Sequence, residues 1–92
     1  MINGDSREFV DGLYYGDERF FLYNGKKYFV QGYYKNKKPM LEVYILYPAE
    51  NSFNWRAFSN DDSYPVAEFE TAKIFDGKTF WEVEKEIEWI DC

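Results

Sequence analysis

Four glutamates alternate with other residues near the end of the chain: Glu82, Glu84, Glu86 and Glu88. Paired carboxylates perform general acid–base chemistry when repulsion between like charges raises the pKa of one of them. Such a pair also needs a shaped, buried site, and a calcium loop needs alternating oxygen ligands around a glycine turn, which this run lacks. The run is therefore interpreted as a solvated acidic face or, together with Asp91, as an acidic patch that contacts a protein.

Other catalytic arrangements lack their key residues. The chain has no histidine, so it has neither the commonest general base nor the commonest metal ligand. Its single cysteine, Cys92, cannot form a disulfide within the chain, and no serine stands in a Gly-x-Ser-x-Gly or Ser-x-x-Lys pattern. No glycine-rich phosphate-binding motif is present. We expect a protein that is not an enzyme and that uses no cofactor and no metal.

The charge distribution favours a basic protein partner over nucleic acid. The formal net charge is −6. Residues 1–47 carry seven basic and six acidic side chains, whereas residues 48–92 carry four and eleven. Affinity for nucleic acid comes from clustered lysine and arginine, so direct binding to nucleic acid is not expected. An acidic second half suits a partner that presents a basic surface.

Aromatic residues make up 23% of the 92 residues, enough for an efficient core in one domain that spans residues 1–92. No apolar run is long enough to cross a membrane, and the first residues lack the pattern of a signal peptide, so we expect a soluble cytoplasmic protein. Nine tyrosines exceed what such a core can hide. Because tyrosine is enriched at protein interfaces, we take four aromatic residues as candidate binding residues. They are Tyr33, Tyr34, Tyr44 and Trp55.

The first half of the chain predicts a helix followed by a hairpin. Apolar residues share one helical face over residues 6–15, with Asp5 or Ser6 as the cap and Gly16 as the left-handed residue after the end. Strands are expected at residues 19–23 and 27–34, because Asn24-Gly25 is typical of a tight hairpin turn. Alternation predicts a third strand at residues 40–47 and a shorter fourth at residues 53–58.

The last third predicts helices. Helical spacing after Pro65 indicates a helix that runs to about Ile74. Residues 79–90 fit either a helix, with a capping box formed by Thr79 and Glu82, or a strand that places Trp81 and Trp89 on one face. The helix is favoured because glutamate and lysine are good helix formers. The expected fold is α+β, with an N-terminal helix, a three- to four-stranded antiparallel meander and two C-terminal helices.

Three segments carry a resemblance: residues 6–16, residues 21–32, and the ending IFDGKTFWEVEKEIEW. They resemble a group of small proteins of bacteria and their phages or mobile elements. That group has no assigned activity, so the resemblance implies no functional residue. The chain is also similar in size and charge to phage-borne inhibitors of bacterial defence, which include anti-CRISPR proteins.

Two functions are therefore expected from the sequence. The first is a non-catalytic acidic module that binds a protein and inhibits a basic target that handles nucleic acid. The acidic patch would steer association and the exposed aromatic residues would anchor it. The alternative is a domain that binds a small molecule in an aromatic pocket between the sheet and the helices.

Overall fold

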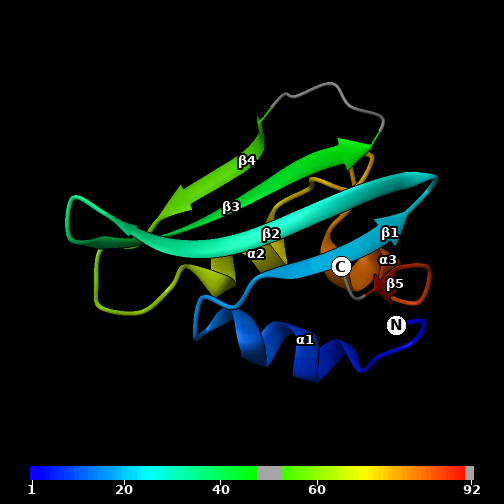
Figure 1. The fold of residues 1–92 in the computed structure, drawn as a ribbon, viewed down its shortest axis with the longest axis horizontal. Helices are drawn as coiled ribbons and strands as arrows, with labels where there is room; N and C mark the ends of the chain where they lie inside the picture. Colours follow the sequence, from blue (N-terminus) through cyan, green and yellow to red (C-terminus); the bar gives the residue numbers. More distant parts are fainter. Residues whose placement is uncertain (48–52, 91–92) are drawn as a thin grey trace.

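An antiparallel sheet forms the frame of the molecule. The computed structural model describes residues 1–47 and 53–90, and the strands lie in the order β4-β3-β2-β1-β5 (Figure 1). The elements are, along the chain, α1 (Ser6–Leu13), β1 (Arg19–Tyr23), β2 (Lys26–Lys35), β3 (Lys38–Tyr47), β4 (Phe53–Phe58), α2 (Val66–Thr71), α3 (Phe80–Val83) and β5 (Glu88–Ile90). This confirms the α+β class. The expected meander gains a fifth strand that follows the helices.

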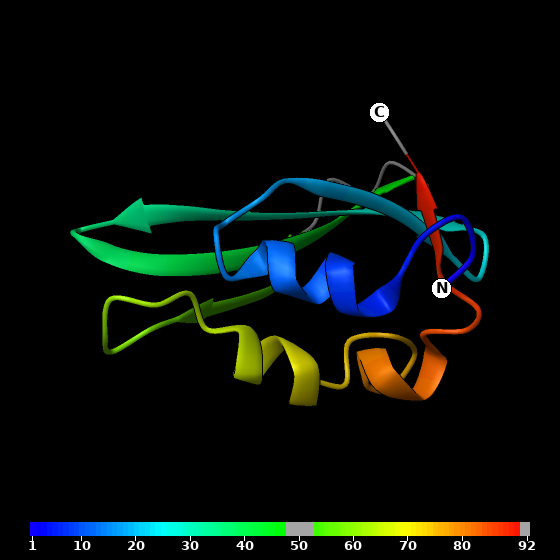
Figure 2. The same cartoon turned by 90° about the horizontal axis from the view of Figure 1, so that it is seen from below.

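All three helices lie on the same side of the sheet (Figure 2). The layer between sheet and helices is filled by aromatic rings that have no solvent exposure, among them Phe9, Phe21, Phe69, Phe75 and Phe80. Phe9 stacks on Phe80 with ring centroids 5.5 Å apart. No described element covers the opposite side of the sheet, which we call the open face.

The predicted hairpin is confirmed. Asn24 and Gly25 take φ values of 49° and 75°, as a tight turn with two left-handed residues requires. The turn sets the register of β1 against β2, so that Phe20 lies opposite Phe29. Strand alternation then directs Phe20 and Phe29 to the open face and Phe21 to the core.

The N-terminal helix is also confirmed, although it is shorter than expected. The Asp5 carboxylate accepts hydrogen bonds from the backbone N–H groups of Arg7 and Glu8, so Asp5 is the cap. The helix ends at Leu13, and Gly16 follows with φ 72°. The last two residues of the predicted span belong to the turn that leads into β1.

The favoured helix over residues 79–90 is wrong beyond its first turn. The Thr79–Glu82 capping box is present, but α3 ends at Val83. After a turn, β5 pairs with β1, which places Phe20 opposite Ile90 and Leu22 opposite Glu88. The backbone N–H and C=O groups of β5 are satisfied by β1, a partner distant in sequence that a local helical pattern cannot reveal. The helix prediction therefore describes the start of this segment, and the strand alternative describes its end.

Helix α2 is shorter than its prediction as well. It ends at Thr71, and Ala72 is already extended with ψ 136°. The chain then reaches Phe75 and Lys78, which exchange two backbone hydrogen bonds around a turn. None of the helices in the described part of the chain is long and apolar enough to cross a membrane.

Candidate functional site

A row of aromatic rings crosses the open face on three neighbouring strands. The ring centroids of Phe20 and Phe29 lie 4.7 Å apart, and those of Phe29 and Tyr44 lie 6.2 Å apart at an interplanar angle of 14°. Phe29 is thus nearly parallel to Tyr44 and tilted by 34° against Phe20, so the three rings are close neighbours across the strands. A base of single-stranded nucleic acid needs a free ring face on which to stack. Closely spaced aromatic rings also suit packing against apolar side chains of a protein.

Beside the row lies a charged residue that is almost completely buried. Glu42 is 1% exposed and faces away from the core, between Gln31 on β2 and Arg56 on β4. The Tyr44 hydroxyl donates to Glu42 Oε2, and Arg56 Nε lies 3.6 Å from Oε1. Among the described residues, Oε1 has no hydrogen-bond donor. The bond to the Glu42 carboxylate is the main reason that the pKa of Tyr44 is raised.

The open face continues along the strands toward the β2–β3 turn. Tyr33 lies opposite Met40, which in turn lies opposite Phe58 at the end of β4. Met40 is fully buried although it is outside the core cluster, whereas Phe58 is 48% exposed. At this end of the open face a buried methionine thus lies beside an exposed phenylalanine.

The four candidate aromatic residues lie on two different faces. Tyr33 and Tyr44 are on the open face, as their pairing with Met40 and Phe29 shows. Tyr34 points to the helix side, where its ring meets Tyr64 edge to face at 5.8 Å. Trp55 also points inward and packs against the core. The structure therefore brings only two of the four to the surface that carries the aromatic row.

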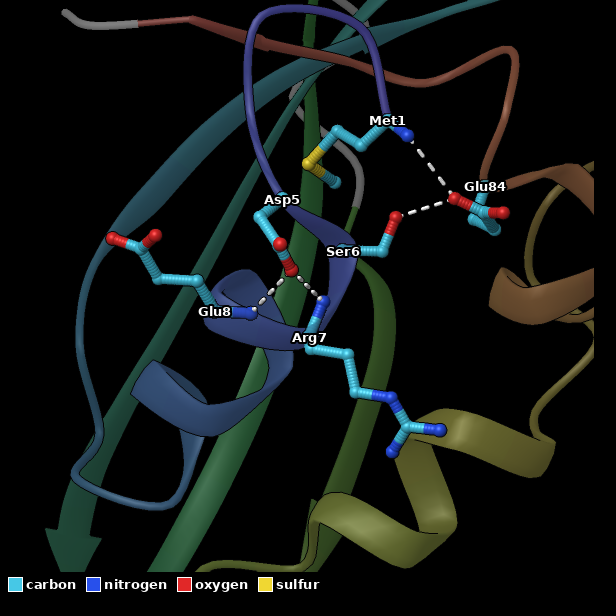
Figure 3. Close-up of polar contacts among 6 residues, drawn as sticks. All are labelled: Met1, Asp5, Ser6, Arg7, Glu8 and Glu84. Carbon is cyan, nitrogen blue, oxygen red and sulfur yellow. Dashed lines mark hydrogen bonds and ion pairs between the residues drawn. The ribbon is translucent and has the colours of Figure 1, made fainter.

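Two of the candidate glutamates are held by contacts within the fold. Glu82 accepts from the backbone N–H of Thr79, and this bond is the main reason that the pKa of Glu82 is lowered. Glu84 accepts from the Ser6 hydroxyl and from the Met1 ammonium group, whose nitrogen lies 3.1 Å from Oε2 (Figure 3). The Ser6 bond, followed by the Met1 charge, lowers the pKa of Glu84. Glu82 thus caps the start of its own helix, whereas Glu84 joins the N-terminal segment to the turn after α3.

The other candidate glutamates reach a shared groove. Glu88 lies on the open face and accepts from Asn3 Nδ2 at 2.9 Å. Glu86 is exposed on the preceding turn. Together they line a groove of about 470 Å³ at the end of the sheet where the β1–β2 hairpin turns. Asp91 lies outside the described residues.

The sequence interpretation missed most of the open face. Phe20, Phe29, Glu42 and Arg56 were not among its candidates, although the Asn24-Gly25 turn already places Phe20 opposite Phe29. Extending that register to β3 would have placed Tyr44 in the same row. Within residues 1–47 and 53–90, no three acidic or cysteine side chains are grouped so that they could hold a metal ion.

Comparison of the chain with protein-family models, curated proteins and solved structures gave no match.

Proposed function

We propose that this chain is a non-catalytic protein-binding module that docks through the open face of its sheet. The observation that carries the proposal is the row of neighbouring rings formed by Phe20, Phe29 and Tyr44, over which no described element lies. Contiguous aromatic surface on one side of a small domain is typical of protein interaction sites.

The arrangement of charge supports a protein partner for this face. Its charged side chains include Lys27, Arg56 and Glu88, while Glu42 is buried beneath its neighbours. This mixture, set around aromatic rings, resembles the apolar centre and polar rim of a protein interface. The acidic residues Glu86 and Glu88 border the face at its hairpin end, where they suit a basic region of the partner.

The finer form of the proposal is inhibition in the cytoplasm of a basic protein that handles nucleic acid. A chain that covers such a surface would exclude nucleic acid by occupying its site, without any chemistry of its own. A purified target would then bind either this chain or nucleic acid, and a ternary complex would overturn this finer form.

The alternative, a small-molecule pocket between the sheet and the helices, has less support. Rings without solvent exposure, such as Phe9, Phe21 and Phe69, occupy that layer. The groove described above lies instead at the surface of the sheet.

The test compares capture of host proteins by matched variants. Phe58→Ser combined with Tyr33→Ser removes two aromatic side chains from the open face. Tyr15→Ser is the control, since Tyr15 is 82% exposed and lies in the turn that follows α1, outside the sheet. We expect a protein that the natural chain and the control capture equally to be lost with the double variant. Equal capture by all three folded proteins would overturn the proposed function.

A further inference from the structure

The groove at the hairpin end of the sheet combines apolar walls with carboxylates, and we call it the hairpin-end groove. Its volume is about 470 Å³. Ile2, Leu22 and Tyr47 line it beside Glu86 and Glu88, and the Asn24-Gly25 turn also contributes to its lining. Leu22 and Glu88 are opposite one another in the β1–β5 pair, so the groove continues the open face.

Neither of these two carboxylates forms an ion pair within the described part of the chain. Glu88 receives a neutral donor, the Asn3 amide, and neither glutamate takes part in an ion pair. The two lysines of the β1–β2 hairpin are engaged elsewhere: Lys26 Nζ lies 2.8 Å from Asp76 Oδ1, and Lys27 Nζ lies over the Phe20 ring, 5.4 Å from its centroid. Lys85, which precedes Glu86, is exposed and forms no ion pair with either glutamate. The hairpin-end groove therefore presents two carboxylates without ion-pair partners among the described residues, beside apolar surface.

We propose that the hairpin-end groove receives an arginine side chain of the protein that docks on the open face. This inference rests on the proposed function and names the partner's chemistry. The aliphatic part of the side chain would lie along Ile2 and Leu22, and its guanidinium group would meet Glu86 and Glu88. Long cationic side chains bury their carbon stems in this way while their charged ends stay solvated or paired.

Arginine fits this groove better than lysine. A guanidinium group offers a planar fork of donors that can serve two carboxylates, and it stacks on an aromatic ring. Tyr47, which is 66% exposed, supplies such a ring at the edge of the groove. An ammonium group is a compact, strongly hydrated charge and gains less from both features.

A second copy of this chain is a poor source of the arginine. All three of its arginines already have partners: Arg7 lies over Trp81 at 5.6 Å, Arg19 pairs with Asp17, and Arg56 pairs with Glu42. Placing one of them in the groove would break a contact within the fold. A different protein is therefore the better source of the arginine.

The experiment titrates the isotope-labelled chain with the blocked tripeptide acetyl-Leu-Arg-Leu-amide and follows backbone amide signals by NMR. We expect the shifts to concentrate at Leu22, Gly25, Tyr47 and Glu88. A peptide with citrulline in place of arginine should bind about tenfold more weakly, because it keeps the shape and loses the charge. Shifts located elsewhere, or equal binding of the two peptides, would overturn the inference.

Matched variants complete the experiment. Glu86→Gln combined with Glu88→Gln should weaken the arginine peptide by about tenfold, since charge-assisted bonds become neutral ones. The control, Glu18→Gln with Asp62→Asn, changes net charge equally at exposed sites away from the groove and should leave binding unchanged. Tyr47→Ser provides a third variant, with weaker binding expected through loss of the stacking ring. Equal effects of the groove and control variants would contradict the inference, whereas the capture experiment on Phe58 and Tyr33 tests the proposed function separately.

Discussion

Glu42 shows how one residue shapes the open face. It is the only acidic side chain in the described part of the chain that is buried, and it lies outside the core. Tyr44 and Arg56 are both drawn toward it. A buried carboxylate without partners is costly, so the bond from Tyr44 and the ion pair with Arg56 are what allow Glu42 to lie there. The face thereby keeps one defined arrangement of polar groups among its rings.

Glu84 makes the stability of the fold depend on pH. Its pKa lies below the ordinary value of 4.5 because the Ser6 hydroxyl and the Met1 ammonium favour the ionised form. A lowered pKa means that this contribution is complete well above pH 4.5 and disappears as the pH falls through the pKa of the folded state. We therefore expect Glu84→Gln to lower the melting temperature at pH 7, and we expect the difference from the natural chain to shrink at acidic pH.

The control for this measurement is Glu18→Gln, which removes an exposed carboxylate for which no side-chain contact is described. Its melting temperature should follow that of the natural chain across the same pH range. Parallel curves for the natural chain and Glu84→Gln from pH 7 to acidic pH would show that Glu84 contributes nothing through its charge.

The sequence predicted correctly the helices and strands whose ends are determined by residues close in sequence. Asn24-Gly25 specifies a hairpin because both residues accept positive φ, and Asp5 specifies the start of α1 because its carboxylate reaches two free N–H groups. The strands at residues 40–47 and 53–58 followed from alternation. The structure confirms all of these elements, with small differences at their ends.

Strand β5 could not be predicted in this way, because its partners are distant in sequence. It pairs with β1 and also with Ile2, whose N–H donates to the Ile87 carbonyl and whose carbonyl accepts from the Trp89 N–H. The glutamates around it favour a helix locally.

For the same reason the acidic candidates could not be placed: they were expected on shared faces of one element, and the chain distributes them over a helix, a turn and a strand.

A capping box formed by Thr79 and Glu82 stabilises the start of α3. The Thr79 hydroxyl accepts a hydrogen bond from the Glu82 N–H, and the Glu82 carboxylate accepts one from the Thr79 N–H. Thr79→Ala should lower the free energy of unfolding by about 1 kcal/mol, measured by urea denaturation. Thr71→Ala is the control, because that hydroxyl bonds only to carbonyls of its own helix, and it should stay within about 0.5 kcal/mol of the natural chain. Equal losses in the free energy of unfolding for Thr79→Ala and Thr71→Ala would show that the capping box does not stabilise the fold.

At the scale of the whole molecule, the fold separates two kinds of surface. The helix side carries exposed acidic residues such as Glu8, Asp11 and Glu68, while the open face carries the aromatic row. The sequence showed both the acidity and the surplus of aromatic residues. It could not show on which side each of them lies, because this depends on which face of the sheet the helices cover.

The strand order predicts how the molecule opens. Strand β2 lies at the centre with a partner on each side, whereas β4 lies at one edge and pairs with β3 alone. We expect amide hydrogens of β2 to exchange at least about 100-fold more slowly than those of β4, because exchange in the centre requires a larger opening of the sheet. Hydrogen exchange followed by NMR measures this ratio, and similar rates in both strands would contradict it.

The bridge between Ile2 and β5 limits how the sheet can grow. Ile2 occupies backbone groups on the outer side of β5, so that edge is closed at this point, while β4 has no strand beside it among the described residues. An open edge is a template for another strand, and a protein with two such edges can polymerise into a ribbon. Within the described residues, the edge without any neighbouring backbone is that of β4. A strand added to this sheet is therefore expected along β4, where two molecules could join edge to edge.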